Sequence, residues 1–205
     1  MNAVVITPVG PAALLIECVD PAQARAWYDE LWQRRERGEF AADDIIPGAR
    51  TVLVDGVADP SATAGLLAGW QAPAGTGRTG HSIDVPVHFD GPDLDDVAEL
   101  WETSPQGVVD RLTTTTFSVA FCGFAPGFGY LTGLPAQLSV PRLDTPRPQV
   151  PAGSVGLAGG YAGIYPTASP GGWRLVGRTD AVLFDVHAEP PALLTPGTTV
   201  RLRAR

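Results

Sequence analysis

The residue best suited to binding chemistry is an arginine that ends an apolar run in the second half of the sequence. Arg178 follows Trp173-Arg174-Leu175-Val176-Gly177. Because a guanidinium presents parallel N–H groups, it can clamp a carboxylate or a phosphoryl group. Arg142 and Arg147, which both stand beside prolines, are candidates for a second anion contact. The alternative is that these arginines bind backbone carbonyls and hold loops together.

Three hydroxyl groups in the same stretch are candidates for catalysis or substrate binding. Ser154 stands in P-A-G-S-V, Ser169 stands in S-P-G-G-W, and Tyr165 ends G-I-Y. Neither serine has a base nearby in the sequence, so a Ser-His-Asp triad would need a distant histidine. The available histidines are His81, His88 and His187. Tyr165 could instead fill a barrel and leave its hydroxyl in water. We predict Arg178, Ser154 and Tyr165 as the catalytic residues.

A tight turn precedes these residues in F-A-P-G-F-G-Y-L. Pro126 and Gly127 set a turn between two phenylalanines, and such a turn can present backbone N–H groups to an anion. The pattern is neither a dinucleotide-binding fingerprint nor a nucleophile elbow. The predicted substrate-contacting residues are Pro126, Gly127, Phe128, Arg142, Arg147, Ser169, Gly171, Gly172 and Trp173.

The elements that must position these residues divide into two predicted domains, 1–80 and 81–205. In the first, strands at 12–19 and 51–54 alternate with helices that begin at Asp20-Pro21 and Asp59-Pro60, where an acidic cap precedes a proline. This order predicts a small α/β sandwich. The stretch Q-A-P-A-G-T-G-R-T-G at 71–80 is typical of a linker.

The second domain is predicted to be mostly β. Residues 81–89 alternate apolar and polar, with Pro86 favouring an edge strand. Two short helices begin at Asp93 and Ser104, and a strand is expected at 113–122. Shorter strands are expected at 154–158, 173–178, 181–185 and 199–203. Short strands with dense Gly and Pro turns favour a β-barrel, so the fold class is α+β.

Composition excludes several classes of function. All 14 basic residues are arginine, which excludes a P-loop lysine and a Schiff-base lysine. The net charge of −8 argues against nucleic acid as a partner, including for the two short helices as a DNA-reading pair. Cys18 and Cys122 have no metal-binding spacing and are expected to be buried thiols of a reducing cytoplasm. The sequence predicts no zinc site, no signal peptide and no membrane-spanning segment.

Five motifs between residues 123 and 179 occur in the order that is typical of one known family. They are G-F-x-P-G-F, P-R-x-x-x-P-R, V-P-A-G-S-V, G-I-Y-P and S-P-G-G-W-x-L-x-G-R-T. The chain resembles the B subunit of 5-oxoprolinase, a family also called allophanate hydrolase subunit 1 or kinase inhibitor KipI. It differs at Gly129, where the family usually has proline, and at Gly160-Tyr161-Ala162, where it usually has Asn-Gln-Thr. The resemblance implies a ferredoxin-like domain followed by a cyclophilin-like β-barrel.

The same resemblance implies an activity and partners. It implies ATP-dependent opening of 5-oxo-L-proline to L-glutamate, with Mg²⁺ accompanying ATP. It also implies a hetero-oligomer with a larger C subunit, which is similar to allophanate hydrolase subunit 2, and an A subunit is a further candidate partner. Relatives with two other functions share the same motifs. One is inhibition of a histidine kinase, and the other is a carboxyltransferase component of the allophanate hydrolase or urea carboxylase type.

Overall fold

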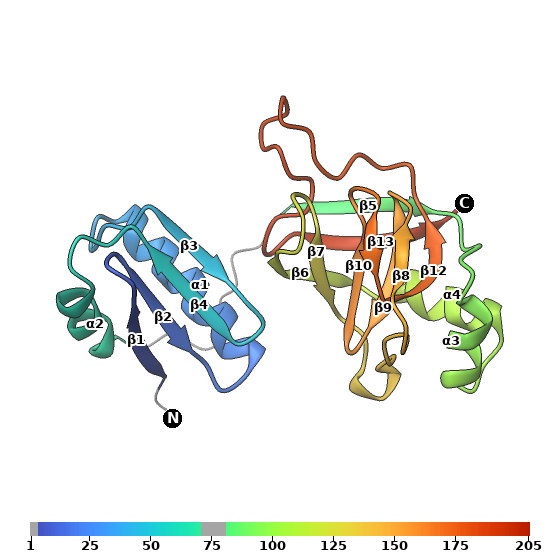
Figure 1. Ribbon diagram of the computed structural model, residues 1–205, viewed down its shortest axis with the longest axis horizontal. Coiled ribbons are helices and arrows are strands. Elements are labelled where there is room, and N and C mark those ends of the chain that lie inside the picture. The colour runs from blue at the N-terminus through green and yellow to red at the C-terminus, as the bar shows by residue number, and fades with distance from the viewer. Residues whose placement is uncertain (1–3, 71–80) are drawn as a thin grey trace. The chain divides into compact units, whose positions relative to one another are not determined.

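The structure is a computed structural model that describes residues 4–70 and 81–205 (Figure 1). The chain divides into two compact units, Met1–Arg78 and Thr79–Arg205. The predicted linker, 71–80, lies outside the described residues, so it stays a prediction. None of the helices in the described part of the chain combines the length and the apolarity that a membrane crossing needs.

The first unit is a four-stranded antiparallel sheet with two helices. Its elements are β1 (Val5–Val9), β2 (Ala13–Glu17), α1 (Pro21–Glu36), β3 (Asp44–Pro47), β4 (Thr51–Asp55) and α2 (Pro60–Ala68). The strands lie in the order β1-β2-β4-β3. Because β4 is antiparallel to both β2 and β3, these two strands are parallel to each other, and α1 connects them. This split β-α-β arrangement is the ferredoxin-like pattern that was expected.

Both helices of this unit begin where the sequence predicts. The Asp20 carboxylate accepts a hydrogen bond from the Gln23 N–H at 2.7 Å, and the Gln23 side chain accepts one from the Val19 N–H at 2.9 Å. Asp59 caps α2 in the same way through the Ala62 N–H at 3.0 Å. These side chains satisfy backbone donors that a helix start would otherwise leave unpaired. The short strands β1 and β3 were not predicted.

The second unit is a nearly closed seven-stranded barrel, and its elements begin with β5 (Ser82–Val87), α3 (Leu94–Leu100), α4 (Pro105–Thr114), β6 (Phe117–Cys122) and β7 (Gly129–Thr132). They continue with the 3-10 helix η1 (Ala136–Leu138), β8 (Arg147–Val150), β9 (Ser154–Ala158), β10 (Tyr161–Ile164), β11 (Ser169–Gly171), β12 (Arg174–Arg178) and β13 (Thr199–Ala204). The sheet order is β12-β9-β10-β7-β6-β13-β5, while β8 and β11 pair separately.

The barrel closes through one pair of residues. His88 and Arg178, which follow β5 and end β12, exchange backbone hydrogen bonds of 2.8 and 2.9 Å. They join the two ends of the sheet order, so the α+β class with a C-terminal barrel is confirmed. Pro86 lies in β5, at the end of the sheet, as a residue without an N–H requires.

Two predicted strands in this unit need correction. The strand expected at 113–122 begins only at Phe117, because Thr113 and Thr114 belong to α4 and their hydroxyls donate to the Val109 and Asp110 carbonyls. The strand expected at 181–185 is wrong. Residues 181–194 form a projecting arm with a single bridge, Phe184 to Ala192, because the prolines opposite lack the N–H groups that a ladder needs.

Candidate functional site

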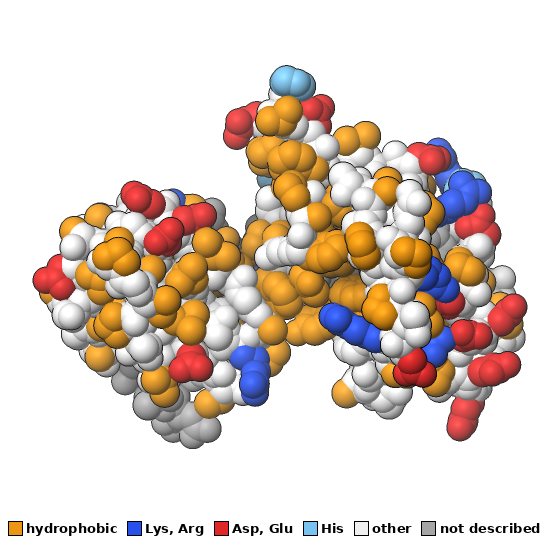
Figure 2. Space-filling view, in the orientation of Figure 1, with side chains coloured by type: hydrophobic (Ala, Val, Ile, Leu, Met, Phe, Trp, Pro, Cys, Tyr) orange, Lys and Arg blue, Asp and Glu red, His pale blue; other side chains and the backbone are white. Residues whose placement is uncertain are grey.

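A layer of aromatic side chains covers the outer face of the barrel sheet. In β10 the residues alternate, so that Ala162 and Ile164 lie in the barrel core while Tyr161 and Tyr165 lie on the opposite face. The other members of the outer cluster are Phe128, Val150, Ala158, Trp173 and Leu175, with Ala125 and Tyr130 packed against them. Figure 2 shows a continuous hydrophobic area on the second unit over β6, β7 and β10.

Glycines let the rings lie directly against the sheet. A Cβ on Gly163 would stand 2.8 Å from Cζ of Phe128 and 2.9 Å from Cζ3 of Trp173, both too close for real atoms. A Cβ on Gly156 would stand 3.1 Å from Cβ of Trp173. The Phe128 ring meets those of Trp173 and Tyr165 edge-on, with centroids 5.4 Å apart in both pairs. Gly156 and Gly163 therefore leave the space that the aromatic rings occupy on the sheet.

Phe124 stands above this layer in a strained conformation and was not predicted as a site residue. Its φ is +72°, and the Ala125 N–H donates to the Gly123 carbonyl at 2.9 Å, which closes a tight γ-turn around it. The residue is 60% exposed, yet its ring meets those of Phe128 and Tyr165 edge-on, with centroids 5.3 and 6.1 Å apart. A bulky residue held at positive φ with much of its surface in solvent is a candidate functional position. No spacing rule in the sequence identifies such a turn.

The predicted Pro126-Gly127 turn is present beside Phe124. The Phe128 N–H donates to the Ala125 carbonyl at 2.9 Å, and Gly127 has a φ of +85°. A Cβ on Gly127 would stand 2.8 Å from Cβ of Phe184, so the turn packs closely against the arm. Pro126 is exposed and Phe128 is buried in the aromatic layer.

Tyr165 supplies a neutral phenol at the edge of the layer. The residue is only 2% exposed, and a Cβ on Gly171 would overlap its hydroxyl. Burial raises the pKa of Tyr165, while a hydrogen bond to the Trp173 backbone and the charges of Arg142 and Arg147 oppose that rise. The phenol therefore keeps its proton at neutral pH and can donate a hydrogen bond.

Three of the four arginines between residues 123 and 180 are neutralised by acids from the segment 84–110. They form the pairs Arg147–Asp93 at 2.6 Å, Arg174–Asp96 at 2.6 Å and Arg178–Asp90 at 2.9 Å. The Asp93 carboxylate also accepts the Leu175 N–H at 2.6 Å. The acidic and basic segments, which are separate in the sequence, thus meet across the barrel.

Arg142 differs from these three. It is exposed and forms no ion pair with a described residue, and its charge partly opposes the rise that burial causes in the pKa of the Tyr165 phenol. The Leu143 N–H donates to the Gly172 carbonyl at 2.8 Å, which holds this loop beside Gly171 and Gly172. Arg178, in contrast, has its guanidinium on Asp90 at the barrel seam, with side chains 58% and 50% exposed.

The two predicted serines lie on different strands, Ser154 in β9 and Ser169 in β11. Ser154 is 5% exposed, and its carbonyl accepts the Tyr165 N–H at 2.9 Å. The Ser169 hydroxyl is buried and has no hydrogen-bond partner among the described residues. Neither hydroxyl forms a hydrogen bond with a histidine in the described part of the chain. Ser169 stands in β11 with Gly171, whose position the Tyr165 hydroxyl abuts.

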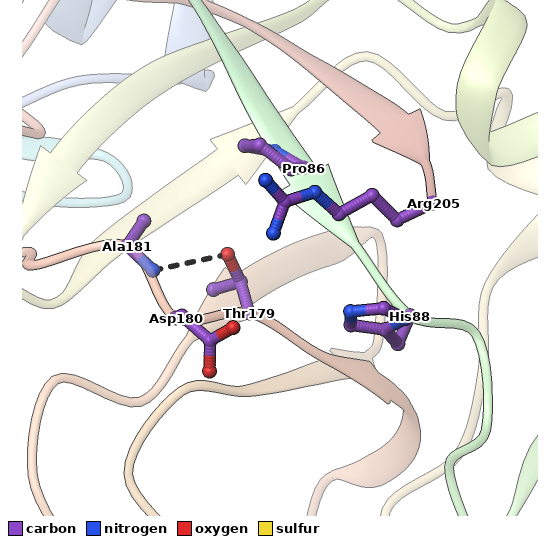
Figure 3. Close-up of a pocket in the computed structure, with 6 residues that line it drawn as sticks. All are labelled: Pro86, His88, Thr179, Asp180, Ala181 and Arg205. Carbon is purple, nitrogen blue, oxygen red and sulfur yellow. Dashed lines mark hydrogen bonds between the residues drawn. The ribbon is translucent and has the colours of Figure 1, made fainter.

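A small hollow lies next to the barrel seam (Figure 3). Its volume is about 230 Å³, and it is lined by Pro86, His88, Thr179, Asp180, Ala181 and Arg205. The Thr179 hydroxyl accepts the Ala181 N–H at 3.2 Å and braces one wall. Its lining mixes both signs of charge and contains none of the predicted site residues. Residues 4–70 and 81–205 contain no group of three His, Cys, Asp or Glu side chains that could hold a metal ion.

Comparison with known proteins identifies the family. The model of the carboxyltransferase domain, subdomain C and D, matches residues 4–194. The chain belongs to this carboxyltransferase-domain family. It is 36% identical to the B subunit of 5-oxoprolinase from Haemophilus influenzae, over 96% of this chain and 95% of that protein. It is 43% identical to the B subunit of 5-oxoprolinase from Bacillus subtilis over 58% of this chain, a match that spans 51% of the relative.

Solved structures agree with this assignment. The protein TTHA0988 is 30% identical, with a TM-score of 0.75 over 94% of this chain and 40% of its own. The K. lactis urea amidolyase, at 20% identity and a TM-score of 0.76, shows the fold alone and is covered over 15% of its length. The chain thus spans less than half the length of each of these two structures. The relatives named as the B subunit of 5-oxoprolinase confirm the resemblance that the sequence motifs indicated.

One of the two departures noted with the resemblance in the sequence falls on the aromatic layer. Tyr161, within the Gly160-Tyr161-Ala162 departure, meets Phe121 and Tyr130 edge-on at 5.7 and 5.8 Å. The substitution therefore adds a ring where a polar side chain is expected. Gly129, the other departure, packs against Leu194 and Val119 of the barrel core.

Proposed function

We propose that this chain is a subunit of an ATP-dependent 5-oxoprolinase, which hydrolyses 5-oxo-L-proline to L-glutamate together with ATP. The names of the relatives support the subunit role. The observation that carries the proposal is Arg142, a guanidinium with no ion pair among the described residues, on the loop that Gly172 holds next to Gly171, against which the Tyr165 hydroxyl lies. Such a surface suits a small ring that bears one carboxylate and one carbonyl.

Each of these groups has a separate role toward that substrate. Arg142 binds the carboxylate, since it is the guanidinium in the motif segment that no acid neutralises. Tyr165 donates a hydrogen bond to the lactam carbonyl oxygen, where negative charge develops when the ring opens. The exposed ring of Phe124 packs on the flat face of the lactam and fixes its orientation.

The chain contributes only part of an ATP site. An amide is a poor electrophile, and a phosphoryl group placed on its oxygen would supply a leaving group. A triphosphate requires several cationic groups, whereas this sequence has no lysine and the motif segment offers one unpaired arginine. We therefore infer that ATP and Mg²⁺ are held mainly by partners in the cytoplasm, namely the C subunit with or without the A subunit.

A second function is favoured by the family description alone. As a component of a carboxyltransferase, which the family description names, the chain would act on an allophanate or urea derivative. Arg142 and Tyr165 would bind the carboxylate and carbonyl of that substrate in the same way, so the geometry does not separate the two functions.

Co-expression with the candidate partners tests the proposal. The complex is purified through a tag on this chain, and ADP release is measured with 5-oxoproline and, separately, with urea and allophanate. We expect ADP release that depends on 5-oxoproline and is stoichiometric with glutamate. Turnover of only urea or allophanate would replace the proposal with the carboxyltransferase function.

A further inference from the structure

Residues 181–194, the arm, project from the barrel (Figure 1). Both ends are anchored in the barrel core, where Leu183 is 3% exposed and Leu194 is fully buried. Between these anchors the chain leaves the barrel and returns. None of the candidate site residues lies in the arm, so the proposed chemistry does not account for its shape.

Backbone hydrogen bonds give the arm a defined shape. The Leu193 N–H donates to the Leu183 carbonyl and the Asp185 N–H to the Pro191 carbonyl, both at 2.9 Å. At the tip, the His187 N–H donates to the Asp185 carboxylate at 2.9 Å. A segment ordered in this way loses little conformational entropy when it binds, which favours tight association.

The arm presents apolar side chains to solvent. Val182 and Val186 are 69% and 72% exposed, and Phe184 and Leu193 are each 39% exposed. Val182 and Phe184 flank the buried Leu183, so they point away from the barrel core, and Val186 follows at the turn that forms the tip. Within the described residues 81–205, the other large hydrophobic side chains that are exposed are Leu100 and Phe124. Such a concentration marks a protein interface.

Charge indicates what kind of surface covers the arm. Asp185 and Glu189 flank the tip, and neither forms an ion pair with a described residue. A second copy of this chain would bring a net charge of −8 and an identical acidic tip. A partner with an apolar groove bordered by Lys or Arg is complementary to both features.

We propose that the arm is the element by which this chain inserts into another protein of its enzyme complex, in an apolar groove with a basic rim. This inference rests on the proposed function for the existence of that partner. The arm is continuous with the candidate site, because Phe184 packs against the Gly127 turn beside Phe124. Insertion would therefore place the partner next to the aromatic layer.

Binding of the purified C subunit to full-length variants tests the inference. The double variant Val182→Asp/Val186→Asp places charge on the arm without disturbing the core, since both residues are exposed. Leu100→Asp is the matched control, because Leu100 is 46% exposed on α3, outside the arm. We expect affinity to fall by about tenfold or more in the double variant and to stay at the wild-type value in the control.

The outcomes separate this inference from the proposed function. If the wild-type chain binds the C subunit while the double variant binds it equally well, the arm is not the interface, although the complex stands. If the wild-type chain binds none of the candidate partners, the proposed complex fails and the inference fails with it. If the substitutions abolish a homodimer of the wild-type chain, the occupant is a second copy and the inference is overturned. Melting temperatures that match the wild type confirm that each variant is folded.

Discussion

At the scale of single residues, Arg142 and Arg178 differ in the groups that surround their guanidinium, and this difference decides what each can bind. The acid opposite Arg178 already occupies the N–H groups that a substrate would use. Since the Arg178 and Asp90 side chains are 58% and 50% exposed, their ion pair contributes little to folding stability, about 0–1 kcal/mol. Arg142 has no such competitor among the described residues and is the more suitable anion ligand.

Arginine-to-lysine variants separate the two assignments. We expect Arg142→Lys to lose about 1.5–3 kcal/mol of substrate binding, because lysine keeps the charge and removes the planar fork. Arg178→Lys should leave substrate affinity unchanged. The measurement is the KM for 5-oxoproline in the assembled complex, with melting temperature as the control. A larger effect on KM from Arg178→Lys would restore the assignment that the sequence suggested.

The Tyr165 phenol should affect stability at alkaline pH in a predictable direction. Burial raises its pKa above the ordinary value of 10, so above that pH the folded chain holds a proton that the unfolded chain has lost. Folding stability should therefore fall as pH rises from 10 upward.

Tyr165→Phe, which has no proton to lose, should lose less stability over the same range. Denaturant unfolding of both proteins at pH 8 and above pH 10 measures the difference, and the comparison removes the contribution of the other titrating groups. Equal losses in the two proteins would show that the phenol ionises as it would in water. At neutral pH the variant should also reduce turnover, because it lacks the hydrogen-bond donor.

At the scale of elements, helices and strands could be predicted from the sequence where neighbouring residues in the chain set their boundaries. The caps at Asp20 and Asp59 set two helix starts correctly because the bonding groups lie within four residues of one another. The pairing of Arg147 with Asp93 spans 54 residues and could not be predicted. The γ-turn at Phe124 was missed because phenylalanine does not favour positive φ, and only the surrounding loop imposes it.

The aromatic layer depends on a glycine in β10, Gly163, and on another in β9, Gly156. We expect Gly163→Ala to destabilise the fold by about 1–3 kcal/mol, because the new methyl group would meet the rings of Phe128 and Trp173 at under 3 Å. Gly160→Ala is the matched control, since a Cβ there meets nothing within 4 Å and needs no positive φ. Urea unfolding of the two variants measures the difference. Equal stability would mean that the rings have room to move.

At the scale of the whole molecule, each unit builds its core from its own residues. The core of the first unit consists of buried residues between Leu14 and Leu67. The barrel core and the aromatic layer consist of buried residues between Val85 and Leu202. A unit with its own core can fold alone. The strands that close the barrel, β5 and β12, also belong to the second unit.

The fragment 81–205 should therefore fold without the first unit and keep the candidate site. It contains Phe124, Arg142, Tyr165 and the arm, whereas the distinctive residues of the first unit are helix caps and buried aromatics. We expect a single cooperative thermal transition by circular dichroism, and we expect the fragment to bind the C subunit with the affinity of the full chain. Limited proteolysis of the full chain should cut within 71–80 and release the same fragment. A fragment that folds but does not bind this partner would place part of the interface in the first unit, and one that fails to fold would show that the barrel needs its neighbour.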